Sequence, residues 1–582
     1  MSLVRKLFPL ALALVLLGGA IQGVSGLRSE PEVQGDLKPT SDQLDAAEEI
    51  AAKLKHHYRR LEFDDTLSSQ VLDSYLKDLD PNRQYFLATD IREFERYRDQ
   101  LDDQLSRGQL EAGYTIFNRF QERLETRLGK LLDTIKNDLD SLTFDDQETV
   151  VVDREDAPWA ANEAELDAIW HRQLKNAVLS MRLNDSSLED IRTRLTRRYE
   201  SQLKRITQNT PEDVFQVYIN ALTQTFDPHT TYFTPHNSEN FDISMSRSLE
   251  GIGAVLQYED GYTKVVRLVP GGPAAKSGQL KPADRIVGVG QDGETPEPVI
   301  GLRLDEVVDQ IRGPKGTKVN LEIIPAGSAS EHDTRTITIE RNKVVLEEQA
   351  AKKDVITIDR DGETLKLGVI EIPAFYLDFA AFHRGDPNYT STTSDVAKLL
   401  VELRKENIDG LVIDLRNNGG GSLLEVNKLV SLFINRGPTV QVRESSGRVS
   451  IEGDKFPGVL YAGPMAVMVN RFSASASEIV SGALQDHGRS KLIGQRSFGK
   501  GSVQSLLPLG RGVDLQSERG VECPGDLPAA SDYSVSTRRS CLSRSIRATP
   551  KMRPTTASTS TTRMAPRSAA RGNGSANVPA TI

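Results

Sequence analysis

Cysteine is almost absent from this chain of 582 residues. The two cysteines, Cys523 and Cys541, both lie near the end of the chain. Two thiols cannot form a disulfide scaffold, and they cannot supply the four thiolates of a structural zinc site. His229 has no metal-ligand spacing to the other histidines, so we expect no metal site.

An excess of basic residues is also lacking. Lys and Arg number 72 against 82 Asp and Glu, which gives a formal net charge of −10. This acidic balance argues against nucleic acid as the main partner. The composition, with 26% charged and 38% hydrophobic residues, is that of an ordinary soluble protein. The length allows about four domains.

A long apolar run occurs only at the start of the chain. Arg5 and Lys6 precede apolar residues 7–21, and small residues at 24–26 offer a cleavage site. This order is typical of an export signal, and the run is shorter than the ~20 apolar residues of a transmembrane helix. We therefore expect a signal peptide at residues 1–26 and an exported protein. An uncleaved membrane anchor is the alternative.

Residues from about 40 to 220 have a helical pattern. Apolar residues recur at spacings of three and four behind the possible cap Thr40, and again over residues 116–135. A short motif occurs twice, as D-P-N-R-Q-Y-F at 80–86 and D-P-H-T-T-Y-F at 227–233. Each copy follows a helical pattern and indicates a turn that ends a helix and docks two aromatic residues. We expect a helical domain over residues 27–246.

The pattern changes at about residue 247. Short apolar runs separated by Gly and Pro predict a compact β-rich module over 247–343, with a short helix at 304–311. From 365 to 505 predicted strands and helices alternate, which indicates an α/β core over 344–511. The expected fold class is multidomain α+β, with a helical region, a β module and an α/β core.

A loop of small residues opens the first predicted strand of the β module: Gly251, Ile252, Gly253 and Ala254. Such a loop can leave successive backbone N–H groups free to bind a carboxylate. If the adjoining strand edge is open, an extended peptide can pair with it and place its C-terminus in the loop. A glycine-rich entry into a strand, with no ligand, is the structural alternative.

A serine-rich segment, R-F-S-A-S-A-S-E at 471–478, lies at a predicted strand-to-helix turn. A hydroxyl there sits at a helix N-terminus, where the dipole and unpaired N–H groups favour a developing oxyanion. Ser475 and Glu478 also fit a capping box, in which the serine only satisfies helix donors. The spacing leaves both interpretations open.

A serine nucleophile needs a base. Asp486 and His487 lie eleven or twelve residues along the same predicted helix as Ser475, about 16–18 Å away. Lys500 lies beyond the next predicted strand and can return to the serine. To act as a base it must be neutral, which requires burial to lower its pKa from about 10.4 towards 7 or 8. Its glycine neighbours and the apolar Phe498 are compatible with such burial.

The same lysine lies in a near match to the phosphate loop G-x4-G-K-[ST]. Gly501 replaces the hydroxyl that would hold magnesium, and the following residues read as a strand where a phosphate loop requires a helix. A nucleotide hydrolase is therefore a disfavoured alternative. A non-catalytic carboxylate-binding scaffold is another.

Residues 472–504, together with the β module, resemble the carboxyl-terminal processing peptidases. The likeness is to their long, tail-specific type from the Gram-negative periplasm, and it extends from the helical region to about residue 510. The module at 247–343 resembles a PDZ domain. The resemblance implies a peptidase that needs neither metal nor nucleotide. It also implies a PDZ-like module that captures apolar C-termini of protein substrates through Gly251 to Ala254. A lipoprotein adaptor is a further implied partner.

The resemblance also implies site residues. Ser475 matches the family's nucleophile, Lys500 its general base, and Gln504 the residue that orients the lysine. The run D-L-R-N-N-G-G-G at 414–421 matches the family's glycine turn. It implies an oxyanion hole from the N–H of Gly419 or Gly420 together with that of Ala476. Asp486 corresponds to a supporting structural residue.

The composition changes again after about residue 512. Residues 512–582 carry ten Lys and Arg against five Asp and Glu, and no Asp, Glu, Phe or Trp occurs from 533 onward. A disordered basic tail is one interpretation. A reading-frame shift is the other, because the resemblance stops soon after Gln504, where the family continues with further core strands. A catalytically impaired PDZ-type peptide-binding protein is then the alternative function.

Overall fold

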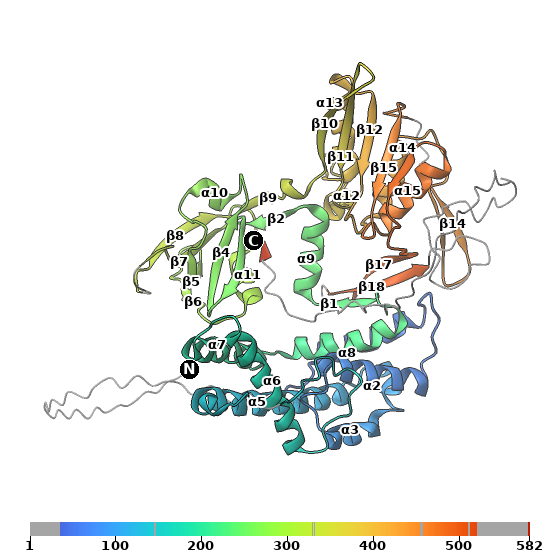
Figure 1. Ribbon diagram of the computed structural model, residues 1–582. Helices are drawn as coiled ribbons and strands as arrows, with labels where there is room; N and C mark the ends of the chain where they lie inside the picture. Colours follow the sequence, from blue (N-terminus) through green and yellow to red (C-terminus); the bar gives the residue numbers. More distant parts are fainter. Residues whose placement is uncertain are drawn as a thin grey trace, which may run out of the picture.

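The computed structural model describes residues 35–144, 147–328, 330, 332–453, 458–509, 513–520 and 580–581 (Figure 1). The expected signal peptide at 1–26 and both cysteines lie outside these residues. Among the described helices, none combines the length and apolar character that crossing a bilayer requires.

The first part of the described chain is helical, as expected. Thr40 caps the first helix, since its side chain accepts the Gln43 N–H and its own N–H donates to the Gln43 side chain. Two apolar cores hold the domain together. Its elements are α1 Ser41–Leu54, α2 Asp65–Leu79, α3 Ala88–Phe94, η1 Glu95–Tyr97, α4 Leu101–Ser106, α5 Glu111–Asn137, η2 Leu139–Ser141, α6 Glu163–Arg182, α7 Leu188–Ile206 and α8 Pro211–Phe226.

The repeated motif ends a helix in both copies, as predicted. In the first copy the Asp80 carboxylate accepts the backbone N–H groups of residues 84–86 at 2.8–3.0 Å, and Tyr85 and Phe86 are buried. In the second copy Asp227 accepts the N–H of His229 at 2.9 Å. The chain then enters a short strand, β1 Thr231–Phe233.

A single helix, α9 Pro235–Ser246, leads from β1 into the β module (Figure 1). The module's main sheet has the order β3-β4-β5-β7-β8, and a separate pair joins β2 to β9. A further strand, β19 Ala580–Thr581, adds to the outer edge of β3. The elements are β2 Ser248–Gly251, β3 Ala254–Glu259, β4 Tyr262–Leu268, α10 Pro273–Ser277, β5 Arg285–Gln291, β6 Glu297–Pro298, α11 Leu304–Ile311, β7 Lys318–Ile324, β8 Arg335–Glu340 and β9 Asn342–Val345.

The α/β core has a sheet of order β10-β11-β12-β15-β16, parallel except for β10. Parallel strands present their carboxyl ends at one edge, which is where ligands bind in such folds. The elements are η3 Glu347–Gln349, β10 Lys352–Arg360, β11 Glu363–Glu371, α12 Phe379–His383, α13 Thr392–Lys405, β12 Gly410–Asp414, α14 Leu423–Ser431, β13 Val440–Arg443, β14 Val449–Glu452, β15 Met465–Val469, α15 Ala476–Asp486 and β16 Lys491–Gly494.

A third sheet joins the core to the helical domain. Its order is β1-β18-β17, with β17 Ser502–Leu509 directly after Lys500 and β18 Val513–Gly520 in the middle. β18 pairs with β17 from end to end and with β1 from the second motif copy. The strand that follows Lys500 therefore has a partner beyond residue 511, the predicted end of the core.

Candidate active site

Ser475 occupies a sharp turn between β15 and α15. Its φ of +52° and ψ of −112° lie outside the common regions for a residue with a side chain, a strain typical of functional sites. The Ser475 side chain makes no capping hydrogen bond. Glu478 instead accepts the Ser475 backbone N–H at 2.7 Å. Ser475 therefore stands at the N-cap position of α15, and the Glu478 half of the predicted capping box is formed.

A glycine turn after β12 packs directly against the serine. A methyl group at Gly420, whose φ is +114°, would lie 3.0 Å from the Ser475 Cβ. At Gly421 the added carbon would lie 2.3 Å from the Phe375 carbonyl oxygen. Glycine is required at both positions because the backbone approaches so closely.

The buried side chain of Asn418 organises this turn. Its Oδ1 accepts the Gly420 N–H at 2.8 Å, and its backbone oxygen accepts the Ser477 hydroxyl at 2.9 Å. The Gly420 N–H is therefore occupied, which leaves Gly419 as the turn's candidate oxyanion donor. Ala476 is the first residue of α15, where the N–H has no acceptor within the helix.

Lys500 is held from both its backbone and its side chain. Its Nζ donates to Gln504 Oε1 at 2.8 Å, as the predicted orienting role of Gln504 requires. The backbone N–H groups of Gly499 and Lys500 donate to Glu478 at 2.7 and 2.9 Å. The Glu478 carboxylate, only 7% exposed, thus joins the lysine loop to the backbone of Ser475. Sequence reasoning assigned Glu478 only to a possible cap.

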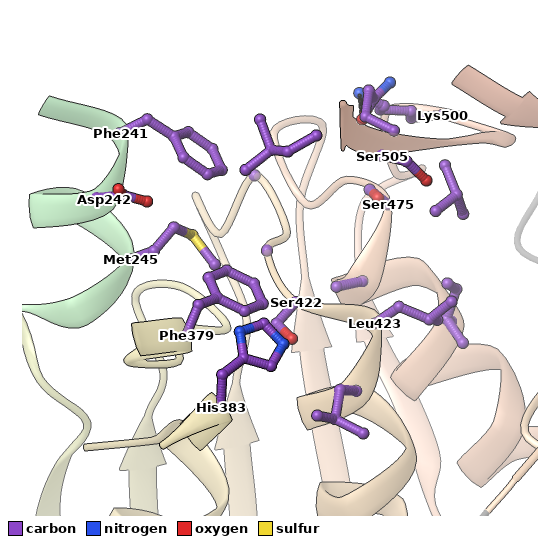
Figure 2. A pocket seen from close by; sticks show the side chains of 18 residues that line it. Phe241, Asp242, Met245, Phe379, His383, Ser422, Leu423, Ser475, Lys500 and Ser505 are labelled. Carbon is purple, nitrogen blue, oxygen red and sulfur yellow. Dashed lines mark hydrogen bonds between the residues drawn. The ribbon is translucent and has the colours of Figure 1, made fainter. Parts of the chain in front are cut away.

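Ser475 and Lys500 line one cavity of about 600 Å³, together with Gly419, Ala476 and Gln504. Figure 2 shows Ser475 and Lys500 on one side and residues of α9 and α12, most of them apolar, on the other. This opposite wall was not predicted, because it comes from distant parts of the chain. Its labelled members are Phe241, Asp242, Met245, Phe379 and His383.

Three other residues near the motif lie away from this centre. His487 directs its Nε2 to the Pro438 carbonyl at 3.0 Å, and Asp486 is the last residue of α15, as the helix-length argument expected. Phe498, whose apolar character is compatible with burial of Lys500, is itself 59% exposed. A strand, β17, follows the lysine loop where a phosphate loop needs a helix.

The predicted carboxylate loop lies between β2 and β3. The carbonyl oxygens of Ile252 and Gly253 accept backbone N–H groups at 2.7 and 2.9 Å, and Gly253 has a φ of +74°. Within the described part of the chain, the N–H groups of Ile252 and Gly253 have no acceptor. This geometry leaves them available to an anion.

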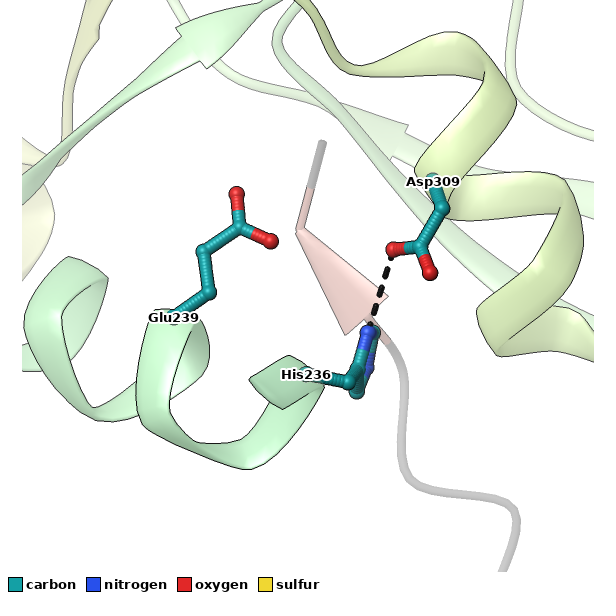
Figure 3. A group of neighbouring side chains, drawn as sticks. All are labelled: His236, Glu239 and Asp309. Atoms are coloured by element: carbon teal, nitrogen blue, oxygen red, sulfur yellow. Dashed lines mark hydrogen bonds and ion pairs between the residues drawn. The ribbon is translucent and has the colours of Figure 1, made fainter. Parts of the chain in front are cut away.

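One cluster of potential metal ligands lies between α9 and α11 (Figure 3). His236, Glu239 and Asp309 bring their ligand atoms within 4.8 Å of one another. His236 Nδ1 lies 3.1 Å from Asp309 Oδ1, and Glu239 lies 3.2 Å from Arg312 Nη1. These pairings account for the cluster as a partly exposed polar network without an ion.

Comparisons with known proteins match this arrangement in three consecutive parts. A model of the tail specific protease N-terminal domain matches residues 50–236, a PDZ domain model 242–324, and the model of peptidase family S41 366–521. The last match, like β18, extends past residue 511.

Individual relatives agree. The tail-specific protease of Haemophilus influenzae is 39% identical over 501 residues, which cover 84% of this chain and 69% of that protein. The carboxy-terminal processing protease CtpB of Bacillus subtilis is 33% identical over 50% of this chain and 55% of its own length. The solved PDZ domain of a Vibrio cholerae carboxy-terminal protease, in complex with a peptide, is 55% identical. It covers 17% of this chain and 97% of that domain, with a TM-score of 0.16.

The tail specific protease N-terminal domain, the PDZ domain and the peptidase family S41 models therefore match consecutive parts of this one chain. The chain belongs to the tail-specific protease family of C-terminal processing peptidases.

Proposed function

We propose that this chain is an exported serine endopeptidase that uses Ser475 as nucleophile and Lys500 as general base. The observation that carries the proposal is that the structure holds the two residues together in one site. Both line one cavity, and the carboxylate of Glu478 accepts N–H groups from the backbone of each. The strained backbone of Ser475 adds support, because such strain persists where a site needs a fixed nucleophile.

The reaction is acyl transfer. The Ser475 Oγ attacks the carbonyl carbon of the peptide bond, and its proton passes to the neutral Nζ of Lys500. The N–H groups of Gly419 and Ala476 stabilise the oxyanion. The C–N bond then breaks, Lys500 returns the proton to the leaving amine, and water hydrolyses the ester on Ser475 by the same route.

The PDZ domain supplies substrate selection in this proposal. The N–H groups of Ile252 and Gly253 bind the free carboxylate of a substrate, and the tail extends along β3 as an added strand. The apolar wall of the cavity, with Phe241, Met245 and Phe379, suits apolar residues near the bond to be cut. The proposal includes a preference for substrates with apolar C-termini, which the family resemblance implies.

The test uses one apolar-tailed peptide, prepared as free acid and as amide. We expect the acid to be cleaved faster, and we expect Ser475→Ala to lower kcat by at least about 10⁴-fold, as for other serine nucleophiles. Equal cleavage of acid and amide would contradict recognition of the free C-terminus. Activity of the Ser475→Ala protein would contradict the assignment of Ser475 as the nucleophile. Melting curves for both proteins control for unfolding.

A second candidate, a peptide-binding protein without turnover, is favoured by one observation. The Lys500 Nζ donates to Gln504, and no hydrogen bond among the described residues joins it to the Ser475 hydroxyl. Catalytic contacts often tighten only when substrate binds, so this geometry does not exclude catalysis. Tail-peptide binding without turnover, unchanged in Lys500→Ala, would establish the binding protein.

Export to the periplasm remains part of the proposal. It rests on the basic start, apolar run and small residues of positions 1–26. N-terminal sequencing of the protein from a cell-envelope fraction should begin after residue 26. A mature protein that still carries the apolar run would instead indicate a membrane anchor. A lipoprotein adaptor, implied by the family resemblance, can be sought by crosslinking in the same fraction.

A further inference from the structure

The outer edge of the PDZ sheet is occupied by the chain itself. β19, formed by Ala580 and Thr581, pairs antiparallel with β3. Ala580 lies opposite Leu256, and Thr581 lies opposite Val255. Figures 1 and 3 both draw β19 between α9 and the PDZ domain, with α11 close by.

The direction of β19 is the one that a substrate tail needs. The register runs from Leu256 to Val255, and therefore towards Ala254 and the loop with the available N–H groups. Strand addition binds a peptide through main-chain hydrogen bonds, so two strands cannot use this edge at once. The sequence from 578 to 582, V-P-A-T-I, is also as apolar as the proposed substrates.

We propose that Ala580–Thr581 is an intramolecular ligand of the groove beside β3 and excludes substrate tails from it. The competition rests on the proposed function of the groove, whereas the docking of β19 does not. A strand of two residues makes few contacts, so its affinity is low. Because it belongs to the same chain, however, it can act at an effective concentration of up to the order of millimolar.

The binding test uses the Ser475→Ala protein, so that no peptide is cut, and a fluorescent apolar-tailed peptide. Ala580→Pro with Thr581→Pro removes both backbone N–H groups and prevents strand pairing. Fluorescence anisotropy should then give a Kd roughly tenfold lower than with the unaltered tail, because the internal competitor is lost. A matched control carries Thr561→Pro and Thr562→Pro in the same tail and should keep the original Kd.

Hydrogen exchange tests the docking independently of peptide binding. The amides of β3 at Val255 and Leu256 should exchange at least about tenfold faster in the Ala580→Pro/Thr581→Pro protein than in the control. Equal exchange, or an equal Kd in all proteins, would overturn the inference and leave the proposed function standing. Faster exchange without peptide binding in any variant would instead overturn substrate-tail recognition, and with it the competition.

Discussion

At the scale of single residues, Glu478 connects the two halves of the proposed site. Its two carboxylate oxygens accept three backbone N–H groups, from Ser475, Gly499 and Lys500. A charged acceptor suits this position because it can serve all three donors at once. Glu478 therefore acts on Ser475 and Lys500 by positioning them, without a place in the proton transfer.

Glu478→Gln should lower kcat by roughly 10- to 100-fold. The amide keeps one oxygen but turns an NH₂ group towards a former donor, and a hydrogen bond to a charged group contributes about 1.5–3 kcal/mol. Steady-state kinetics should show the loss mainly in kcat, with KM changed less than threefold. Glu425→Gln is a matched control, since it alters another buried glutamate, which accepts the Thr393 N–H instead. An equal loss of kcat in both variants would contradict the positioning role.

His57 is a residue whose effect depends on pH. Its Nε2 lies 3.1 Å from the Thr230 hydroxyl, and its Nδ1 accepts the Arg59 backbone N–H, so the buried ring is neutral with its proton on Nε2. Burial lowers the pKa of His57, Asp227 opposes this shift, and Arg59 adds to it. The unfolded chain therefore takes up a proton at a higher pH than the folded chain does.

The stability of the helical domain should consequently fall as the pH drops below about 6.5, the pKa of an unfolded histidine. Its full contribution is present above that pH, and the loss is at most about 1.4 kcal/mol per pH unit until the folded pKa is reached. Urea unfolding at several pH values from roughly 5 to 7 measures this change in the free energy of unfolding. His57→Gln should flatten this slope, whereas His171→Gln, at an exposed position, should keep it. The same slope in both variants would refute the assignment.

At the scale of elements, local patterns in the sequence were enough for most of the fold. The pattern predicts a short helix at residues 304–311, and α11 has these bounds. The serine turn and the lysine loop were also found, because their signals are short runs of neighbouring residues. These features depend on backbone propensity and spacing, which a single sequence contains.

Features that depend on distant segments were not predictable in this way. Residues of α9 and α12 line the cavity beside Ser475 only because distant parts of the chain fold together. The hydrogen bond from the Gly499 N–H to Glu478 likewise joins two separate segments. The exposed Phe498 makes the same point, since the apolar character of one residue does not determine what covers it. The strand β1, which the second copy of the motif forms, was not predictable either, because it pairs with β18 far along the chain.

At the scale of the whole molecule, side-chain hydrogen bonds at the start of α11 join the PDZ domain to the helical domain. Arg303 donates to both carboxylate oxygens of Asp213, at 2.6 and 3.2 Å, and Gln208 donates to the Gly301 carbonyl at 2.7 Å. Both side chains of the ion pair are about three-quarters buried. Since α11 borders the proposed tail groove, this contact ties the groove to the helical domain and, through β1 and β18, to the strand after Lys500.

Breaking this ion pair should separate tail binding from catalysis. Arg303→Ala should weaken the domain contact by about 1–2 kcal/mol, the range for a partly buried, two-fold hydrogen-bonded pair. Isolated tail peptides should bind with an unchanged Kd, because the groove residues are intact. Cleavage of an apolar-tailed protein should slow several-fold, because the bound tail is no longer held in a fixed direction from the cavity.

A double-mutant cycle with Asp213→Ala isolates the pair, since Asp213 also caps α8 through Thr210 and that effect cancels in the cycle. Arg335→Ala, which removes an exposed arginine of the PDZ domain that bonds only within the domain, controls for the loss of one charge. A coupling free energy near zero would show that the two side chains do not fasten the domains. The other contradictory result is a coupling free energy of about 1–2 kcal/mol, the range argued above, with unchanged cleavage of the protein substrate. That result would show that this contact between the domains does not affect catalysis.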